Sequence, residues 1–554
     1  VDPRAYAWRC PEWRGRPWHE AVIYELHTGT FTPAGTFDGV AERLDYLKDL
    51  GVTAIELMPV AHFGGARGWG YDGVYLYAPH PAYGGVEGLK RLVDAAHAKG
   101  LMVLLDVVYN HFGPEGNYIP SWLPQFFHPD VHTPWGPAIA YDEKPVRDFM
   151  IDNALYWLEE YRLDGLRLDA IDAIRDTTDT PLVEELAARV RERISDRHVH
   201  LTTEDDRNIA WHIERAADGS VPLVTAEWND DFHHTAHVLA TGEQYGYYED
   251  YETGSAAQMA RALATGFVYQ GERSRHRGEC IGSASAHLPP GAFVHFLQNH
   301  DQVGNRAFGE RLRYLAPSPA CDCLQAILLL SPQVPLLFQG EEFGDTNPFC
   351  YFTDFDGELG AAVSQGRRDE FRHFPAYRFA AEAFPDPNDE ATFLASKLDW
   401  NELARPVQQR CLELTQKALS VRREVLMPLL AQVRAGADAY VEGRAFAVAW
   451  RFGQGGNSGN GGERYYHLFA NVSDKGFAAP AAFDRTGIGR ARPVRAGDEP
   501  VLAALAEGTL AAWTAVFCLA EAPLFTPNAA FAPDAEEAQD DPFEQGGQAA
   551  PADA

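Results

Sequence analysis

Residues 165–174 read GLRLDAIDAI, a short apolar strand pattern that ends at Asp169. Two later stretches have the same form, HLTTEDDRN at 200–208 with Glu204 and FLQNHDQVGN at 296–305 with Asp301. A strand end is rigid and the loop beyond it opens to substrate, so catalytic groups are favoured there. A single such acid could equally cap a helix or form an ion pair. Three in order, with Arg and His companions, favour the paired carboxylates that cleave glycosidic bonds.

Around these stretches the chain alternates short apolar strands with amphipathic helical runs, which is typical of a parallel sheet wrapped by helices. The strand patterns begin at Ala21, Thr53, Leu101, Gly165, His198, Pro222, Phe293 and Val334. Eight β-then-α units predict an α/β fold, a closed (β/α)8 TIM barrel, with a doubly wound open sheet as the alternative. A short insertion follows the third strand, and a C-terminal all-β domain follows the barrel.

The pattern divides the chain into four parts. Residues 1–20 are expected to be a linker remnant from a missing N-terminal domain, since the start lacks both an initiator Met and a signal-peptide pattern. Residues 21–430 form the predicted barrel, with an insertion at 112–145 that we expect to be a loop excursion over its mouth. A β-sandwich is predicted for 431–523, with a flexible hairpin loop at GQGGNSGNGG. The acidic tail, 524–554, is predicted to be disordered.

The composition limits the classes of partner that the protein is expected to bind. The formal charge of −32 over 554 residues would repel nucleic acid and anionic membranes, whereas a neutral glucan is indifferent to it. No run of about 18 apolar residues predicts a membrane span. The seven cysteines are odd in number and show no CxxC pair, which predicts reduced thiols in a cytoplasmic protein. No cofactor is indicated.

Neighbouring residues suggest roles for the three acids. Arg167 stands two positions before Asp169, so both face the same side of a strand, and a guanidinium there keeps the nucleophile ionised. Glu204, chosen over the adjacent acids, would be the proton donor, with a pKa raised by neighbouring carboxylates and partial burial. Asp301, beside His300, would stabilise positive charge in the transition state.

Two other stretches point to the rim of the barrel. DVVYNH at 106–111 presents His111, which could donate to a sugar hydroxyl, and Asn110, which we expect to brace the insertion. Tyr71 in WGYDGVYLY offers a flat face on which a pyranose can stack.

DVVYNH, GLRLDAIDAI, the strand ending in Glu204 and QNHDQVGN resemble, in order, four regions of the α-amylase superfamily of glycoside hydrolases. The resemblance runs from about residue 22 to 342. It implies a retaining mechanism with Asp169 as nucleophile, Glu204 as general acid/base and Asp301 as stabiliser. It also places Tyr71, His111, Arg167 and His300, with Gln302 and Asn305 of the last motif, around the substrate. Retention predicts Asp169 and Glu204 carboxyl groups about 5–5.5 Å apart.

Finer features (IYELHTGTFTPAGTFDG, TPWGPAI, TEDDRN, EWNDDFHHTAHVLATGE and YFTDF) resemble the maltooligosyltrehalose trehalohydrolase family. That resemblance implies a substrate, maltooligosyl trehalose or a related α-1,4-glucan, and release of trehalose. The expected contacts to the leaving group come from Trp228, Asn229, Asp230, Asp231 and His233.

The sequence departs from that family at Asp172, where its members more often show His, and we expect Asp172 to face the leaving group as well. Asn110 resembles a calcium ligand of some relatives, but the insertion offers no matching acids, so no metal is predicted. Two other functions stay open on the same fold: a glycogen or α-glucan branching enzyme, and a non-catalytic glucan-binding protein.

Overall fold

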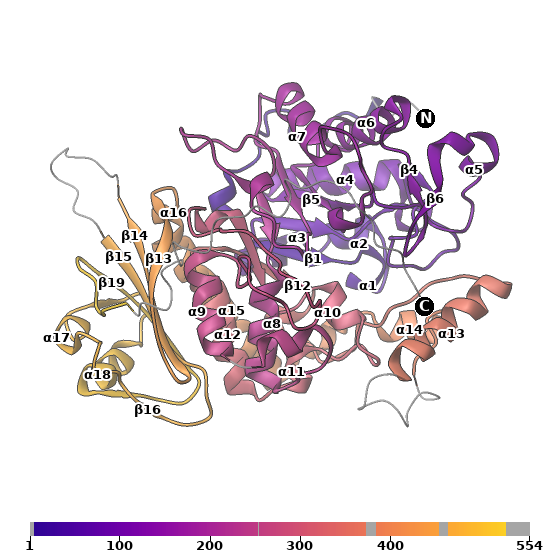
Figure 1. Ribbon diagram of the computed structural model, residues 1–554. Coiled ribbons are helices and arrows are strands. Elements are labelled where there is room, and N and C mark those ends of the chain that lie inside the picture. Colours follow the sequence, from indigo (N-terminus) through magenta and orange to yellow (C-terminus); the bar gives the residue numbers. More distant parts are fainter. Residues whose placement is uncertain (1–4, 253, 373–383, 454–463, 528–554) are drawn as a thin grey trace.

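The computed structural model describes residues 5–252, 254–372, 384–453 and 464–527, and its core is a closed barrel of eight parallel strands (Figure 1). Around the barrel the strand order is β1-β12-β11-β10-β9-β8-β5-β2. This confirms the predicted (β/α)8 barrel and excludes the open sheet. The strands are β1 Ile23–Leu26, β2 Ala54–Leu57, β5 Met102–Val107, β8 Gly165–Leu168, β9 His200–Thr203, β10 Ala226–Trp228, β11 Phe293–Phe296 and β12 Val334–Phe338.

These strands are three to six residues long and buried on both faces, as expected where helices cover the outside and side chains fill the inside. The lower interior is apolar, with Ile23, Met102, Val294 and Leu336 among its members. The interior at the carboxyl ends of the strands is polar, because the strands bring polar or charged groups to that end. We call this end the mouth of the barrel. The inside of the barrel is therefore apolar at one end and polar at the other, along the rim of the mouth.

Helices surround the barrel, and the first two after β1 that cover it are α2 (Phe37–Ala41) and α3 (Leu44–Leu50). The second of these ends at Gly51, whose φ of 108° is a left-handed cap that favours glycine. The helices around the barrel are α2 Phe37–Ala41, α3 Leu44–Leu50, α4 Gly85–Ala98, α6 Lys144–Glu160, α7 Leu182–Arg193, α8 Asp230–Thr241, α9 Ser255–Thr265, α12 Ser318–Leu330 and α15 Pro406–Val421. Other helices lie in the connections: α1 Thr28–Phe31, α10 His300–Gly304, α11 Leu312–Leu315, α13 Gly357–Arg372, α14 Glu390–Ala395 and α16 Met427–Leu430.

The insertion after β5 carries more regular structure than the predicted loop. It contains the short helix α5 Ile119–Trp122 and a hairpin of β6 Phe127–Thr133 with β7 Gly136–Ile139. Beside it lies a second small hairpin, β3 Ala61–His62 with β4 Tyr75–Pro79. In Figure 1 the insertion extends from the barrel on the side where α13 and α14 also project.

The segment before β1 closes the opposite end of the barrel, which we call the floor. Trp13 and Trp18 pack against the apolar cluster of the barrel interior. The Trp13 indole donates to Asp164 at 2.7 Å, and the Trp18 indole donates to the Gly291 carbonyl at 2.8 Å. Residues 5–20 are therefore part of the barrel structure, whatever precedes them.

The C-terminal part is built on an antiparallel sheet that packs against helices of the barrel (Figure 1). The Trp450 indole donates to the Leu263 carbonyl of α9, and the Tyr466 hydroxyl donates to the Leu330 carbonyl of α12. The sheet has the order β13 Val433–Glu442, β14 Ala445–Phe452, β15 Arg464–Asn471, β19 Thr514–Ala520 and β17 Arg492–Pro493. A two-stranded sheet of β16 Phe477–Ala478 and β18 Thr509–Leu510 accompanies it, with α17 Arg485–Ile488 and α18 Glu499–Glu507.

An all-β pattern was thus the right expectation for the strands, with two short helices added. The predicted hairpin loop at 453–462, except Gly453, and the tail from 528 lie outside the described residues. The proposed limits of the four parts stay predictions. Within the described ranges, no helix has the length and apolar character needed to cross a bilayer.

Candidate active site

A single buried guanidinium, Arg167 on β8, organises the mouth of the barrel. Its Nη1 donates to Asp169 Oδ1 and to Asp106 Oδ2, each at 2.7 Å, and its Nη2 donates to Glu204 Oε2 at 2.5 Å. The arginine is fully buried, and the guanidinium lies 4.4 Å from the centre of the Trp228 ring. One cation therefore fixes carboxylates from three strand ends at one place.

Asp169 directly follows β8 and is held from both sides. Besides Arg167, the Asn110 side chain donates to its Oδ2 at 2.9 Å and to its carbonyl at 3.0 Å. Asn110 thus supports the expected nucleophile, and its expected role in bracing the insertion stays a prediction. Hydrogen bonds to both carboxylate oxygens fix its orientation.

Glu204 is the acid of its loop that faces Arg167, because its two neighbours are paired elsewhere. Asp205 binds Arg207 through both oxygens, at 2.7 and 2.6 Å, and Asp206 pairs with Arg277. Glu204 also accepts from the Ala170 amide at 3.0 Å, and Ala170 has a φ of 39°, in the left-handed region. Partial burial and the nearby Asp169 raise the pKa of Glu204, while Arg167 opposes the shift. A raised pKa suits a proton donor.

Asp301 lies in the first turn of α10, beside His300. Its Oδ2 is 3.4 Å from His300 Nε2, and its Oδ1 accepts from Asn305 at 3.2 Å. His300 is buried and donates through Nδ1 to Glu25 of β1 at 2.5 Å. Burial alone would lower the pKa of His300, but Asp301 and Glu25 outweigh it and raise the pKa to about 9. The imidazole is therefore a cation near neutral pH.

Tyr71 joins the histidine to the arginine. Its ring stacks on His300 with centroids 5.2 Å apart, and its hydroxyl accepts from His300 Nε2 at 2.6 Å. The same hydroxyl donates to Asp106 Oδ2 at 2.6 Å. Burial raises the pKa of Asp106 to about 7 against the effect of Arg167. Tyr71 is held rigidly by these bonds, as a ring that orients a pyranose must be.

His111 lies at the rim between Asn110 and the insertion. Its Nδ1 bonds to the Asn110 side-chain oxygen, and its ring stacks on Trp135 with centroids 4.7 Å apart and planes 13° from parallel. Burial lowers the pKa of His111 to about 4, so the ring is neutral at pH 7. Because the Asn110 oxygen is an acceptor, Nδ1 carries the ring proton, and Nε2 of the neutral imidazole could accept from a sugar hydroxyl rather than donate to one as expected.

The acid-rich side of the mouth, toward β10 and β11, holds the other rim candidates. Asp230, at the start of α8, accepts from Gln302 at 3.1 Å, and its pKa is raised by burial and by Glu204 and Asp301. Burial with Asp205 and Glu204 raises the pKa of Asp172, half-buried just after β8. Asn305 is exposed. These residues share one rim with the three acids.

Four predicted contacts instead lie behind the rim, with protein partners. Trp228 is buried under Arg167, and Asn229 donates to the Gly266 carbonyl at 2.9 Å. Asp231 is buried and accepts from four donors: Tyr251, Asn208 and the amides of Val268 and Tyr269. His233 bonds to the Leu297 carbonyl and the Tyr248 hydroxyl. These positions favour support of α8 over contact with sugar.

Sequence reasoning missed Glu25, Asp106, Trp135 and Tyr247. Glu25 and Asp106 are acids inside apolar strands, a signal that could have marked them, because a buried carboxylate needs a partner. Tyr247 is 42 % exposed, and its pKa, raised mainly by burial, also responds to Asp230 and Asp301. Trp135 lies in the TPWGPAI stretch that carries the family resemblance, and this could have marked it.

The part of the chain that the structure describes contains no group of three or more His, Cys, Asp or Glu residues suited to holding a metal ion.

The chain is similar to known proteins over most of its length. The family model described as alpha amylase, catalytic domain, matches residues 19–123 and 124–423. Malto-oligosyltrehalose trehalohydrolase of Deinococcus radiodurans is 45 % identical over 426 residues, covering 76 % of this chain and 69 % of the relative. The Rhizobium sp. enzyme of the same name is 42 % identical, covering 88 % and 79 %.

A solved structure agrees with these relatives. A Salmonella typhimurium protein assigned as an alpha amylase superposes with a TM-score of 0.87 at 47 % identity, over 94 % of this chain and 85 % of that one. Barrel, site residues and relatives point the same way. The chain belongs to the alpha-amylase family and, within it, to the malto-oligosyltrehalose trehalohydrolases.

Proposed function

We propose that the chain is a retaining glycosidase that hydrolyses the α-1,4 bond beside the terminal trehalose unit of maltooligosyl trehalose. The observation that carries the proposal is that Arg167 binds both Asp169 and Glu204 at the mouth of the barrel. Asp301 lies on the same rim, beside His300. Paired carboxylates on a shared support are what a double displacement requires. The carboxyl spacing of about 5–5.5 Å that retention requires stays a prediction.

In the first step Asp169 would attack the anomeric carbon of the glucose bound at the mouth. As the C–O bond to the leaving group breaks, Glu204 transfers its proton to the departing oxygen, and trehalose leaves as a neutral alcohol. Asp301 would lower the energy of the cationic transition state, while Tyr71 and Arg167 hold the surrounding acids in place. The product is a glycosyl ester on Asp169 and an ionised Glu204.

In the second step water would enter on the side that trehalose left. Glu204, now a carboxylate, takes a proton from the water as its oxygen bonds to the anomeric carbon. The ester bond to Asp169 breaks and returns the carboxylate with its electron pair. Two inversions retain the α configuration, and Glu204 ends protonated, as it began.

The acid-rich side of the rim would receive the trehalose unit. Asp172, Asp230, Gln302 and the ring of Tyr247 line that side, with Asn305 near Asp301. A non-reducing disaccharide offers only hydroxyls and ring faces, which carboxylates, amides and a tyrosine ring suit. Relatives at 42–45 % identity that bear the trehalohydrolase name support this choice of leaving group.

Product analysis tests the proposal directly. The wild-type chain, incubated with maltotriosyl trehalose, is expected to release free trehalose, while uncapped maltopentaose of equal length is cleaved far more slowly. Asp169→Asn is the matched control, with an expected loss of at least about 10³-fold in kcat at unchanged folding. New α-1,6 branches in place of trehalose would identify a branching enzyme, and unchanged activity in Asp169→Asn would contradict the mechanism.

The location of the reaction stays a prediction. We propose the cytoplasm, supported by the seven cysteines, which are all described and all free.

A further inference from the structure

The insertion carries a cluster of exposed apolar side chains that its own packing does not use. Eleven large hydrophobic residues are exposed among the described residues, and five of them fall between positions 118 and 135. They are Tyr118 (62 % exposed), Trp122 (80 %), Leu123 (49 %), Val131 (41 %) and Trp135 (50 %). Such clustering exceeds the single exposed residues that any surface shows, and it marks a place of contact. We call these five residues the exposed patch.

A separate set of rings already holds the insertion in place. Phe126 and Phe127 are buried, pack on each other at 5.3 Å between centroids, and contact Phe112 and Phe149 of the barrel. Tyr118 and Trp122, in contrast, stack on no other ring within the described part of the chain. Their exposure is therefore not required for folding of the insertion.

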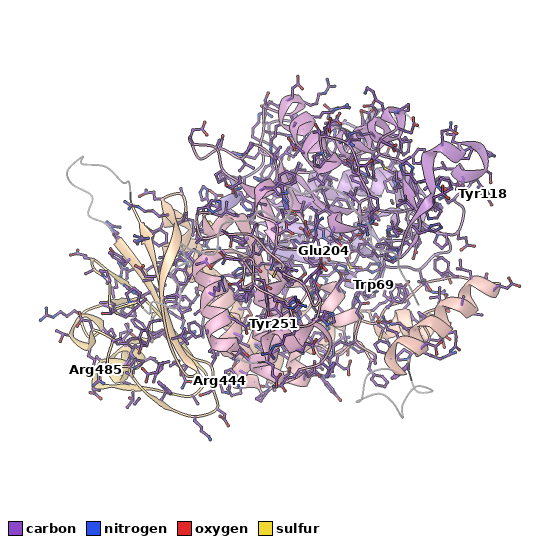
Figure 2. All side chains as sticks on the ribbon, viewed as in Figure 1. Trp69, Tyr118, Glu204, Tyr251, Arg444 and Arg485 are labelled. Carbon is purple, nitrogen blue, oxygen red and sulfur yellow. The ribbon has the colours of Figure 1, made fainter. Side chains whose placement is uncertain are left out.

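One member of the patch, Trp135, borders the catalytic mouth. Trp135 stacks on His111, His111 bonds to Asn110, and Asn110 donates to Asp169 at 2.9 Å. One face of the indole is thus taken by His111, while half of the side chain stays exposed. From there the insertion reaches outward to α5, where Figure 2 shows Tyr118 at the outer edge, far from Glu204.

The chemistry of the patch fits a neutral, hydroxyl-rich chain. Residues 118–135 contain one formally charged residue, Asp130, in a protein whose net charge is −32. Sugar rings present C–H faces that stack on Trp and Tyr, while their hydroxyls remain in water. A charged ligand would find little here to pair with.

We propose that Tyr118, Trp122 and Trp135 bind the glucose units of the donor chain that lie beyond the unit being cleaved, so that the insertion sets chain-length preference. This inference rests on the proposed function and deepens it. Trp135 would take the unit next to the cleaved glucose, and Trp122 with Tyr118 would take more distant units. Short donors would not reach α5.

The test measures kcat/KM for maltooligosyl trehaloses with one to six glucose units. For the wild-type chain, kcat/KM is expected to rise with the length of the donor. Trp122→Ala should lose about 3- to 10-fold on the longest donors and progressively less on shorter ones, and Trp135→Ala should lose from the second unit onward. Tyr314→Ala, an exposed tyrosine (70 %) on α11 outside the insertion, is the matched control and should match wild type at every length.

A second measurement uses binding alone. In an Asp169→Asn background, maltoheptaosyl trehalose should bind about 3- to 10-fold more weakly when Trp122 is replaced by Ala. Unfolding midpoints of the variants should equal that of their parent, because the replaced rings are exposed.

The outcomes separate this inference from the proposed function. Trehalose release by wild type from the shortest donor supports the function whatever the patch does. A Trp122→Ala profile equal to wild type, or lowered equally at all lengths, would overturn the inference while leaving the function intact. Sedimentation of the chain with phosphatidylcholine vesicles, abolished by Trp122→Ala without a change in the length profile, would assign the patch to a lipid surface and also overturn it.

Discussion

At the scale of single residues, the mouth is governed by one cation among several acids. Arg167 contacts three carboxylates, and His300 contacts two more. Each added positive charge favours an ionised neighbour, while burial favours the neutral form. At Glu204, burial and the nearby Asp169 raise the pKa against the effect of Arg167, which suits a proton donor.

Glu204→Gln tests that role. Glu204 must hold its proton to act as the acid, and partial burial with Asp169 raises its pKa above the ordinary 4.5. Wild-type kcat should therefore fall as pH rises through this raised pKa. The variant should lose about 10²- to 10⁴-fold on a trehalose leaving group and lose that pH limb.

The leaving group provides the control for Glu204→Gln. α-Maltosyl fluoride needs little protonation to depart, so formation of the glycosyl ester, seen as a burst of fluoride, should stay close to the wild-type rate. An equal loss on both substrates would reject Glu204 as the proton donor.

His300→Gln tests the charge of the imidazole through stability. Its pKa is about 9 in the fold against 6.5 when unperturbed, because Asp301 and Glu25 outweigh burial. A raised pKa means that the stabilisation is complete below pH 6.5 and is lost as pH rises through 9. The difference in unfolding free energy between wild type and variant should shrink by up to about 3 kcal/mol across that window. Urea titrations at several pH values measure it, and a difference independent of pH would contradict a cationic His300.

Residue-scale roles were only partly predictable from the sequence. Asp169, Glu204 and Asp301 each follow a recognisable strand, and the structure gathers them with Arg167 and His300. Glu25 and Asp106 could not be assigned, because their partners come from strands far away in the sequence. Asp231 shows the opposite case: its motif resembles a sugar contact, whereas the side chain is buried with four donors, so its contact with sugar stays a prediction.

At the scale of elements, α8 is held in place by Asp231, and a matched pair of variants tests this. Asp231→Ala would leave Asn208, Tyr251 and two amides without their acceptor, and we expect a loss of at least about 3 kcal/mol in unfolding free energy. Asp230→Ala, one residue earlier and half-buried, should raise KM with a stability change under about 1 kcal/mol.

Chemical denaturation and steady-state kinetics on the Asp230 and Asp231 variants separate the two roles. If Asp231→Ala kept wild-type stability and raised KM, the original assignment of this residue to trehalose would return.

Elements were predicted unevenly. The eight barrel strands stand out because burial on both faces makes each a compact apolar run. The four-residue α5 and the hairpin β6–β7, whose register shifts between His128 and His132, were missed. Such short elements are fixed by tertiary contacts such as Phe126 on Phe149, and no periodic pattern is long enough to reveal them.

At the scale of the whole molecule, barrel and C-terminal sheet are expected to unfold together. Trp450 and Tyr466 are fully buried and donate to carbonyls of α9 and α12. The contact between the two parts is therefore a packed core rather than a linker.

Calorimetry of wild type and Trp450→Ala tests this coupling. Wild type should show one transition, whereas Trp450→Ala should lose about 3–5 kcal/mol and separate the melting of the sheet from that of the barrel. Tyr75→Ala, which removes an exposed ring, is the control and should leave the profile unchanged. Two transitions in wild type would show that the parts are independent.

The tryptophans at the floor have a consequence for how this lineage can change. Because Trp13 and Trp18 seal one end of the cylinder without help from the loops at the other, selection can lengthen, shorten or exchange those loops while closure of the scaffold is left alone. Sugar specificity can thus change at one end of the molecule, while the residues that preserve the barrel lie at the other end.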